Sequence, residues 1–190
     1  MKGFIALWLC LPWTALPADK LQTYASPDGV FRFQYSPVLV RTTTQPTAGG
    51  DICGEPGAAE ATIAWFTYPN GRLKDKTTFD AAAAFVAVVN EPERGCLEGS
   101  RDWNVETVQK AKINGVAFKL FHASDAWTGH SRNEYYYRVF HNAKCYELSL
   151  QYVNASPGAF DPGIKLLTRQ DWKDVDGRLK QIIRSFQFLR

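Results

Sequence analysis

The chain has 190 residues, of which 45% are hydrophobic, 14% aromatic and 22% charged. This composition is that of a globular protein, and it excludes a collagen, a coiled coil and an intrinsically disordered chain. The formal net charge is only +3. Because nucleic-acid-binding domains carry a pronounced basic patch, we expect no nucleic acid as a partner. The length is that of a single domain.

The first eighteen residues have the layout of a secretory signal peptide. Lys2 provides a positive start, an uninterrupted apolar run spans Phe4–Leu11, and small residues follow at Ala15 and Ala18. The run is too short to cross a bilayer, which needs about 20 apolar residues. We therefore expect a signal peptide over residues 1–18, cleaved after Ala18 or alternatively after Ala15. We further expect no transmembrane segment after cleavage, and a single domain over residues 19–190 that is secreted or periplasmic.

Three cysteines remain after the expected cleavage: Cys53, Cys96 and Cys145. Export places them where disulfides persist, and three thiols allow one bridge in three possible pairings. Cys53 and Cys96 lie in segments rich in Gly, Pro and Glu, whose backbone can adjust to disulfide geometry, whereas Cys145 lies in a strand-like segment. We therefore predict a Cys53–Cys96 disulfide and a packed Cys145. The alternative is Cys145 as the nucleophile of a thiol enzyme.

The first half of the expected domain is predicted to hold several strands and one helix. Alternating or two-sided apolar patterns predict strands over 21–25, 30–35, 38–40 and 61–68. After Thr77, which suits an N-cap, apolar side chains recur at helical spacing, so we expect a helix over 77–89. Loops are expected over 42–56 and 91–101.

The second half is predicted to be a run of strands followed by a helix. The strands are expected over 105–113, 116–123, 134–141 and 144–152. Sequential hairpins indicate an antiparallel sheet. Loops are expected over 124–133 and 154–170. The last helix is predicted from about residue 174 to 185, where apolar side chains line one face.

Four stretches resemble the PsbP-like family of envelope proteins, which includes DcrB-type proteins. They are TYASPDGVFRFQYSP (23–37), KINGVAFKL (112–120), KCYELSLQYVNAS (144–156) and RLKQIIRSFQF (178–188). The resemblance implies an α+β fold in which an antiparallel sheet has helices packed on both faces, a PsbP-like α/β/α sandwich. It also implies a mostly non-catalytic protein, with no shared catalytic residues. The three cysteines depart from the family, so its partners are not implied.

Patterns for catalysis, metals and cofactors are weak. His122, Asp125, His130 and His141 lie near one another in sequence, but their spacing matches no recurring zinc pattern. The chain contains no Gly-x-Ser-x-Gly elbow, no phosphate-binding P-loop and no Gly-x-Gly-x-x-Gly fingerprint. We predict no catalytic residue, no metal and no cofactor.

Aromatic and arginine residues gather in one stretch of the second half. They are Trp127, Arg132, Tyr135, Tyr136, Tyr137 and Arg138. On a strand, Tyr135 and Tyr137 share one face and Tyr136 lies on the other. Core packing is one interpretation of this group. The other is an interaction surface, because Tyr, Trp and Arg are enriched at protein interfaces.

The leading hypothesis is an exported, non-catalytic domain that binds a protein or a cell-envelope component and is a monomer. Two alternatives stay open at this point. One is an exported hydrolase or thiol enzyme. The other is a carrier that holds a small apolar ligand between sheet and helix.

Overall fold

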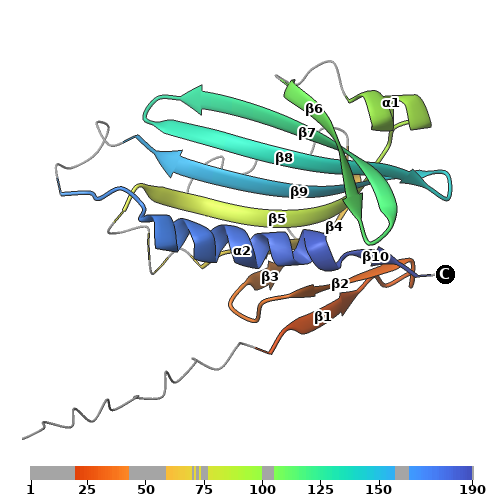
Figure 1. Ribbon diagram of the computed structural model, residues 1–190, viewed down its shortest axis with the longest axis horizontal. Helices are drawn as coiled ribbons and strands as arrows, with labels where there is room; N and C mark the ends of the chain where they lie inside the picture. The colour runs from red at the N-terminus through yellow and green to blue at the C-terminus, as the bar shows by residue number, and fades with distance from the viewer. Residues whose placement is uncertain are drawn as a thin grey trace, which may run out of the picture.

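The structure is a computed structural model, and it describes residues 20–42, 59–69, 71, 73, 77–99, 105–156 and 163–189. Within these residues, two antiparallel sheets and two helices make up an α+β fold (Figure 1). The predicted signal peptide over residues 1–18, Cys53 and most of the loop predicted over 42–56 lie outside the described residues. Within the described part of the chain, no helix is both long and apolar enough to span a membrane.

The larger sheet has seven strands in the order β3-β4-β5-β9-β8-β7-β6, and every neighbouring pair is antiparallel. In that order the strands are β3 (Val40–Thr42), β4 (Ala59–Thr67), β5 (Phe79–Val89), β9 (Lys144–Ala155), β8 (His130–His141), β7 (Val116–Trp127) and β6 (Val105–Ile113). Asn142 and Ala143 both have positive φ in the two-residue β8–β9 turn. This left-handed backbone matches the twist of the two strands and fixes their register.

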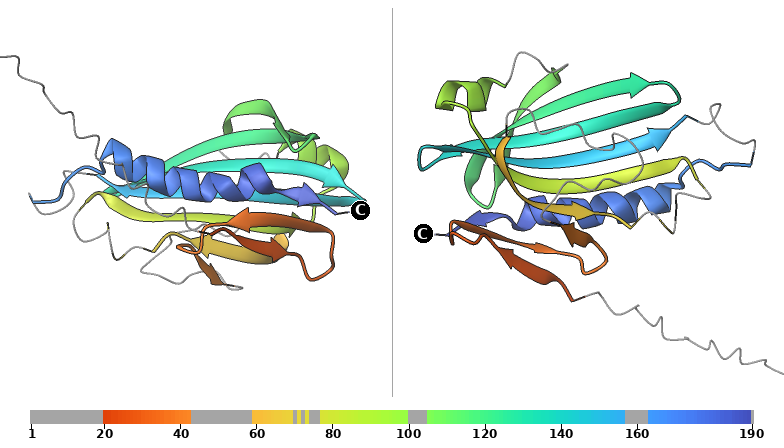
Figure 2. Two further views of the ribbon diagram at one scale, coloured as in Figure 1. Left: turned by 60° about the horizontal axis from the view of Figure 1, so that its bottom comes forward. Right: turned by 180° about the vertical axis from the view of Figure 1, so that it is seen from behind.

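The smaller sheet has the strand order β1-β2-β10 and packs beside helix α2 (Figure 2). Its strands are β1 (Gln22–Ala25), β2 (Phe31–Tyr35) and β10 (Gln187–Phe188). Phe31 and Phe33 alternate with exposed residues and turn their rings into the core, against Tyr146 and Phe66 of the larger sheet. The two sheets therefore share one hydrophobic core.

Helix α2 (Arg169–Ser185) lies along one face of the larger sheet, which we call the inner face. Thr168 and Asp171 form a capping box at its start, which satisfies backbone N–H groups that the first turn leaves without partners. Its buried side chains recur every three or four residues and join the core, namely Val175, Leu179, Ile182 and Ile183. The predicted helix 174–185 is thus confirmed, but it starts five residues earlier.

The prediction of helices on both faces is not confirmed. The opposite, outer face carries only the six-residue helix α1 (Glu93–Glu98), at one end of β8 and β9, within the part of the chain that is described. The predicted antiparallel sheet is confirmed, and most of the described fold is strand.

The helix predicted over residues 77–89 is wrong, because this segment is strand β5. It pairs with β4 on one side and β9 on the other. Both of its faces are buried, with Ala82 and Val86 toward the inner core and Ala83 and Phe85 toward the outer face. A strand covered on both faces is a continuous apolar run, and such a run satisfies helical spacing equally well.

The loops predicted over 91–101 and 124–133 are also partly wrong. The first contains α1, and the second is the continuation of the β7–β8 hairpin, which turns at residues 128–129 where Gly129 has φ +75°. The polar residues near this end of the hairpin resemble a loop in sequence. They are strand residues because β7 and β8, each twelve residues long, pair with each other up to the turn.

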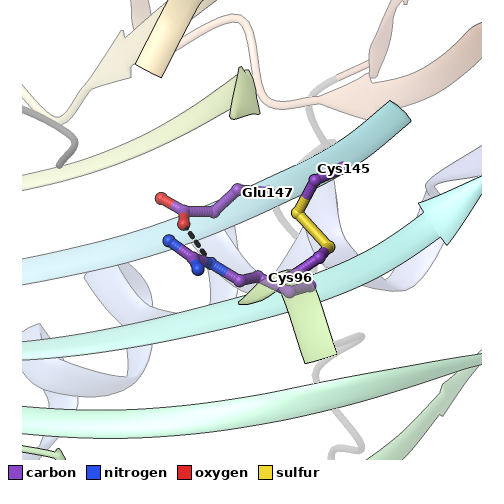
Figure 3. Close-up of a disulfide and its surroundings, with 4 residues drawn as sticks. Cys96, Cys145 and Glu147 are labelled. Atoms are coloured by element: carbon purple, nitrogen blue, oxygen red, sulfur yellow. Dashed lines mark hydrogen bonds and ion pairs between the residues drawn. A yellow bond between two sulfur atoms is a disulfide. The ribbon is translucent and has the colours of Figure 1, made fainter. Parts of the chain in front are cut away.

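The predicted Cys53–Cys96 disulfide is wrong in this structure, because Cys96 pairs with Cys145 (Figure 3). The two Cα atoms lie 5.6 Å apart, and both side chains are fully buried beside Val89 and Phe140. The side chain of Cys145 lies on the outer face of β9, and Cys96 reaches it from helix α1, which packs on that face. A strand residue is therefore well suited to this bridge, because a helix approaches it from outside.

We predict that the Cys96–Cys145 bridge contributes about 4 kcal/mol to the free energy of unfolding, since its loop spans 49 residues. Urea unfolding of oxidised wild type and of the Cys96→Ala/Cys145→Ala double variant measures this contribution. A reducing agent should lower the stability of the wild type and leave the double variant unchanged. Cys53→Ala is the matched control, and a loss of similar size in that variant would contradict the pairing.

Candidate functional site

The predicted interaction surface is divided between the two faces of the sheet. Along β8, Tyr135 and Tyr137 point to the inner face, and Tyr136 and Arg138 point to the outer face. Tyr136 and Arg138 are buried, so for these two residues the core-packing interpretation is correct. The six predicted residues do not form one surface.

Arg138 belongs to a buried ion pair on the outer face. Its Nε donates to Glu147 Oε2 at 2.6 Å, and both side chains are 1% exposed. Ser149 Oγ donates to the other oxygen of Glu147. Burial raises the pKa of the Glu147 carboxyl, while the Arg138 charge and the hydrogen bonds oppose that rise. The pair lies next to the disulfide (Figure 3), so it is part of the structural core.

Tyr136 and Glu134 form a second buried polar contact on the same face. The Tyr136 hydroxyl donates to Glu134 Oε2, and the guanidinium of Arg132 lies 3.4 Å from the other carboxylate oxygen. Burial raises the pKa of the Glu134 carboxyl, and these two neighbours lower it. The outer face of β8 is therefore occupied by side chains that pair with one another.

Trp127 and Arg132 lie at the exposed end of the β7–β8 hairpin. Trp127 is 39% exposed, the Arg132 guanidinium lies 5.9 Å from its ring centroid, and Arg132 also pairs with Asp125 at 3.6 Å. The ring of His130 stacks on Trp127 at 5.5 Å. Of the predicted surface, these two residues are the part that forms a small exposed patch on the outer side.

The three histidines do not converge on a metal site, and no cluster of three or more ligand residues occurs among the described residues. Each histidine instead stacks on a different aromatic ring. The pairs are His122 with Tyr135, His130 with Trp127, and His141 with Phe188.

A serine, a histidine and a carboxylate do meet at one place on the inner face. Glu106 accepts a hydrogen bond from Ser124 through one oxygen and lies 3.1 Å from His122 Nδ1 through the other. In a catalytic triad the histidine stands between the serine and the acid, because it must accept the serine proton. Here the carboxylate stands between them, so this arrangement does not activate Ser124.

A groove lies between α2 and the inner face of β8 and β9. It has a volume of about 450 Å³, within the range of about 300–1,000 Å³ typical of small-ligand sites. Its lining residues are Asn133 and Tyr135 from β8, Tyr152 and Asn154 from β9, and Arg169, Trp172, Lys173, Asp176 and Lys180 from α2. Among the described elements, α2 and the small sheet cover only part of the wide sheet (Figures 1 and 2), and the groove lies beside α2.

Three aromatic side chains form the floor and one wall of the groove. The ring of Tyr152 lies 6.1 Å from that of Tyr135 at 78°, and 5.9 Å from that of Trp172 at 59°. His122 stacks on Tyr135 from the far side at 4.6 Å. Tyr152 is 5% exposed, whereas Tyr135 and Trp172 are partly exposed, so the accessible ring surface comes chiefly from these two. Such ring surface suits a ligand that has an apolar ring face.

Hydrogen bonds hold the centre of the groove rigid. The Tyr152 hydroxyl donates to Asp176 Oδ1 at 2.8 Å, and Lys180 Nζ lies 2.9 Å from Asp176 Oδ2. Burial and the charge of Asp176 raise the pKa of the Tyr152 phenol far above its ordinary value. The phenol therefore remains protonated and keeps donating to Asp176 at every physiological pH.

The rim of the groove is cationic. Arg169 and Lys173 lie one turn apart in the first half of α2, and both are exposed. Neither forms an ion pair within the described ranges. Lys180 is neutralised by Asp176, so the uncompensated positive charge of the groove comes from Arg169 and Lys173.

Of the groove residues, sequence analysis identified only Tyr135 as a site residue. The loop was expected to reach residue 170 and the helix to start only at about residue 174, so the place of residues 169–173 in α2 was missed. A signal was present, because positions 169, 173, 176 and 180 follow helical spacing. Asn-x-Tyr in β8 and Tyr-x-Asn in β9 also place like residues on one strand face.

We predict that Arg138→Met lowers the free energy of unfolding by about 3–5 kcal/mol, because Glu147 is then left buried without its partner. The double variant Arg138→Met/Glu147→Leu should recover most of that loss, since apolar side chains then replace both charges. Urea unfolding of the two variants measures the difference. Equal stability of the single and the double variant would contradict a buried pair.

No family model matches the chain, and no curated protein matches its sequence. Several solved structures are similar to it, among them one from a cyanobacterium and one from a Bacteroides species. The solution structure of cyanobacterial PsbP (CyanoP) from Synechocystis sp. PCC 6803 shares 10% identity over 90% of this chain and 94% of that chain, with a TM-score of 0.44. A crystal structure from Bacteroides thetaiotaomicron VPI-5482 shares 9% identity, with a TM-score of 0.46. The match covers 88% of this chain but 48% of that one, so this chain spans about half its length. A PsbP structure is thus among the structures to which this fold is similar, as the sequence motifs implied. The low TM-scores transfer no function.

Proposed function

We propose that the protein is an exported, non-catalytic binding domain that holds a cell-envelope component or a protein in the groove between α2 and strands β8 and β9. The groove carries this proposal, because it combines aromatic rings with two cations at its rim that have no ion-pair partner among the described residues. Such a combination of apolar surface and a few polar groups is typical of ligand sites.

Two observations support export. The first eighteen residues have the pattern of a signal peptide. The Cys96–Cys145 disulfide also favours an oxidising compartment, because reducing pathways keep cytosolic thiols free.

The chemistry of the described residues favours binding over turnover. Cys145 is consumed by the disulfide and is no thiol nucleophile. Glu106 stands between Ser124 and His122, in the wrong position for a triad. The groove is lined by charged and aromatic side chains, which suits a polar component better than the small apolar ligand of a carrier.

We predict that at least one envelope component raises the Tm of the protein by binding in the groove. A panel of acidic and neutral oligosaccharides, peptidoglycan fragments, acidic peptides and phospholipid vesicles is tested by thermal unfolding. A component at 100 times its Kd adds about 2.7 kcal/mol, or about 5–10 °C for a domain of this size. The component should be recovered with unchanged mass.

Trp172→Ala should abolish that rise in Tm, because Trp172 forms a wall of the groove. Trp127→Ala is the matched control, since it removes the exposed tryptophan of the hairpin end and leaves the groove intact. If no component of the panel raises the Tm, or if the rise persists in Trp172→Ala, the proposed function is wrong.

A further inference from the structure

The strands under the groove can contact a ligand through their side chains only. Their backbone N–H and C=O groups are already used in pairing with neighbouring strands. β8 pairs with β7 and β9, and β9 pairs with β5 and β8, over nearly their whole lengths. A peptide that adds a strand to a sheet needs an open edge for its main-chain hydrogen bonds. The floor of this groove has none, so a ligand must be recognised by its own side groups and ring faces.

The aromatic side chains favour a ligand with a ring. Tyr135 and Trp172 flank Tyr152 at tilted angles, and their centroids lie about 6 Å from it. A saturated ring with C–H groups on its face packs on such surfaces and keeps its hydroxyls at the edge. A flexible chain without rings gains less from them, because its ordering costs more conformational entropy.

The amides supply hydrogen bonds for ring hydroxyls. Asn133 and Asn154 both line the groove, and each carboxamide offers donors and acceptors. The side-chain oxygen of Asn154 is buried and has no hydrogen-bond partner among the described residues. A hydroxyl donor would satisfy this oxygen after a small rotation of the side chain, which relieves the cost of an unpaired buried acceptor.

The cations select an acidic group at the same end. Arg169 and Lys173, from the first half of α2, line the same groove as Asn154. Farther along, Asp176 is already paired with Tyr152 and Lys180. A neutral ring would add no counter-charge to the two cations, whereas a carboxylate or phosphate on the ring forms charge-assisted hydrogen bonds with them.

We infer that the groove binds an acidic carbohydrate, a sugar ring that carries a carboxylate or a phosphate group. This inference rests on the proposed function, and it names the chemical class of the ligand. The ring packs on the partly exposed Tyr135 and Trp172, beside the buried Tyr152, its hydroxyls reach the asparagines, and its acidic group lies at Arg169 and Lys173.

Isothermal titration calorimetry of the mature, disulfide-bonded protein tests this inference with matched probes. An oligogalacturonide supplies acidic sugar rings, its methyl ester supplies the same rings without charge, and hexaglutamate supplies charge without rings. Glucose 6-phosphate and glucuronate separately report a phosphate and a carboxylate. We expect binding of the oligogalacturonide or of glucose 6-phosphate. If the oligogalacturonide binds, its methyl ester should bind at least tenfold more weakly. Hexaglutamate should not bind.

Substitutions then locate the bound ligand. Lys173→Glu should weaken the binding of the acidic probe at least tenfold, and added salt should weaken it in the wild type. Lys112→Glu is the charge-matched control, because Lys112 is an exposed residue of β6 outside the groove. Trp172→Ala should weaken binding of both the acidic oligosaccharide and its ester.

The failures of the two proposals are distinguishable. Equal binding of hexaglutamate, or of the methyl ester, would overturn the acidic carbohydrate. The acidic carbohydrate is also overturned if none of these sugars binds while another envelope component raises the Tm and Trp172→Ala abolishes that rise. In that case the proposed function stands. Oligogalacturonide binding that Trp172→Ala leaves unchanged would overturn the groove as the site, and both proposals with it.

Discussion

Strand β9 is buried on both faces, and the placement of every other functional feature depends on its two-residue alternation. On the inner face, Tyr146, Leu148 and Leu150 pack in the core below α2 and the small sheet, and Tyr152 continues that row into the groove. On the outer face, the alternate residues hold the disulfide and the buried ion pair. A shift of one residue in register would exchange these two sets, which would bury Glu147 in the apolar core. Pairing with β5 and β8 along nearly the whole strand prevents such a shift.

The groove follows from a mismatch in width between the sheet and its cover. Within the described part of the chain, one helix and a three-stranded sheet cover this face of seven strands only in part, and the groove over β8 and β9 lies beside that cover. Side chains at the edge of the covered area contact both the core and the solvent. Tyrosine and tryptophan suit such positions because they combine a large apolar ring with a polar group. The bond from Tyr152 to Asp176 joins the sheet to the helix there. The same residues that close the core therefore give the groove a rigid and chemically specific wall.

The outer face shows how charges are kept in a buried layer. Arg138 and Glu147 are almost completely buried, and taking two charges out of water is favourable only with good geometry and further hydrogen bonds. Ser149 supplies such a bond, and the covalent bridge from α1 to β9 lies next to the pair. The polar residues of β8 that suggested a recognition surface on this face are thus used internally, so the inner face is the better candidate for binding.

The amino-acid sequence alone determined the antiparallel hairpins and the apolar face of the last helix, because these depend on local alternation and turn residues. Only the tertiary structure decided that residues 79–89 are a strand, because a segment buried on both faces has no periodicity of its own. It also decided that Cys96 meets Cys145, since their contact joins a helix and a strand 49 residues apart. The groove was decided in the same way. Tyr135, Tyr152 and Trp172 come from three separate elements, and nothing in the local sequence of each element shows that α2 crosses the sheet at a position where the three side chains meet.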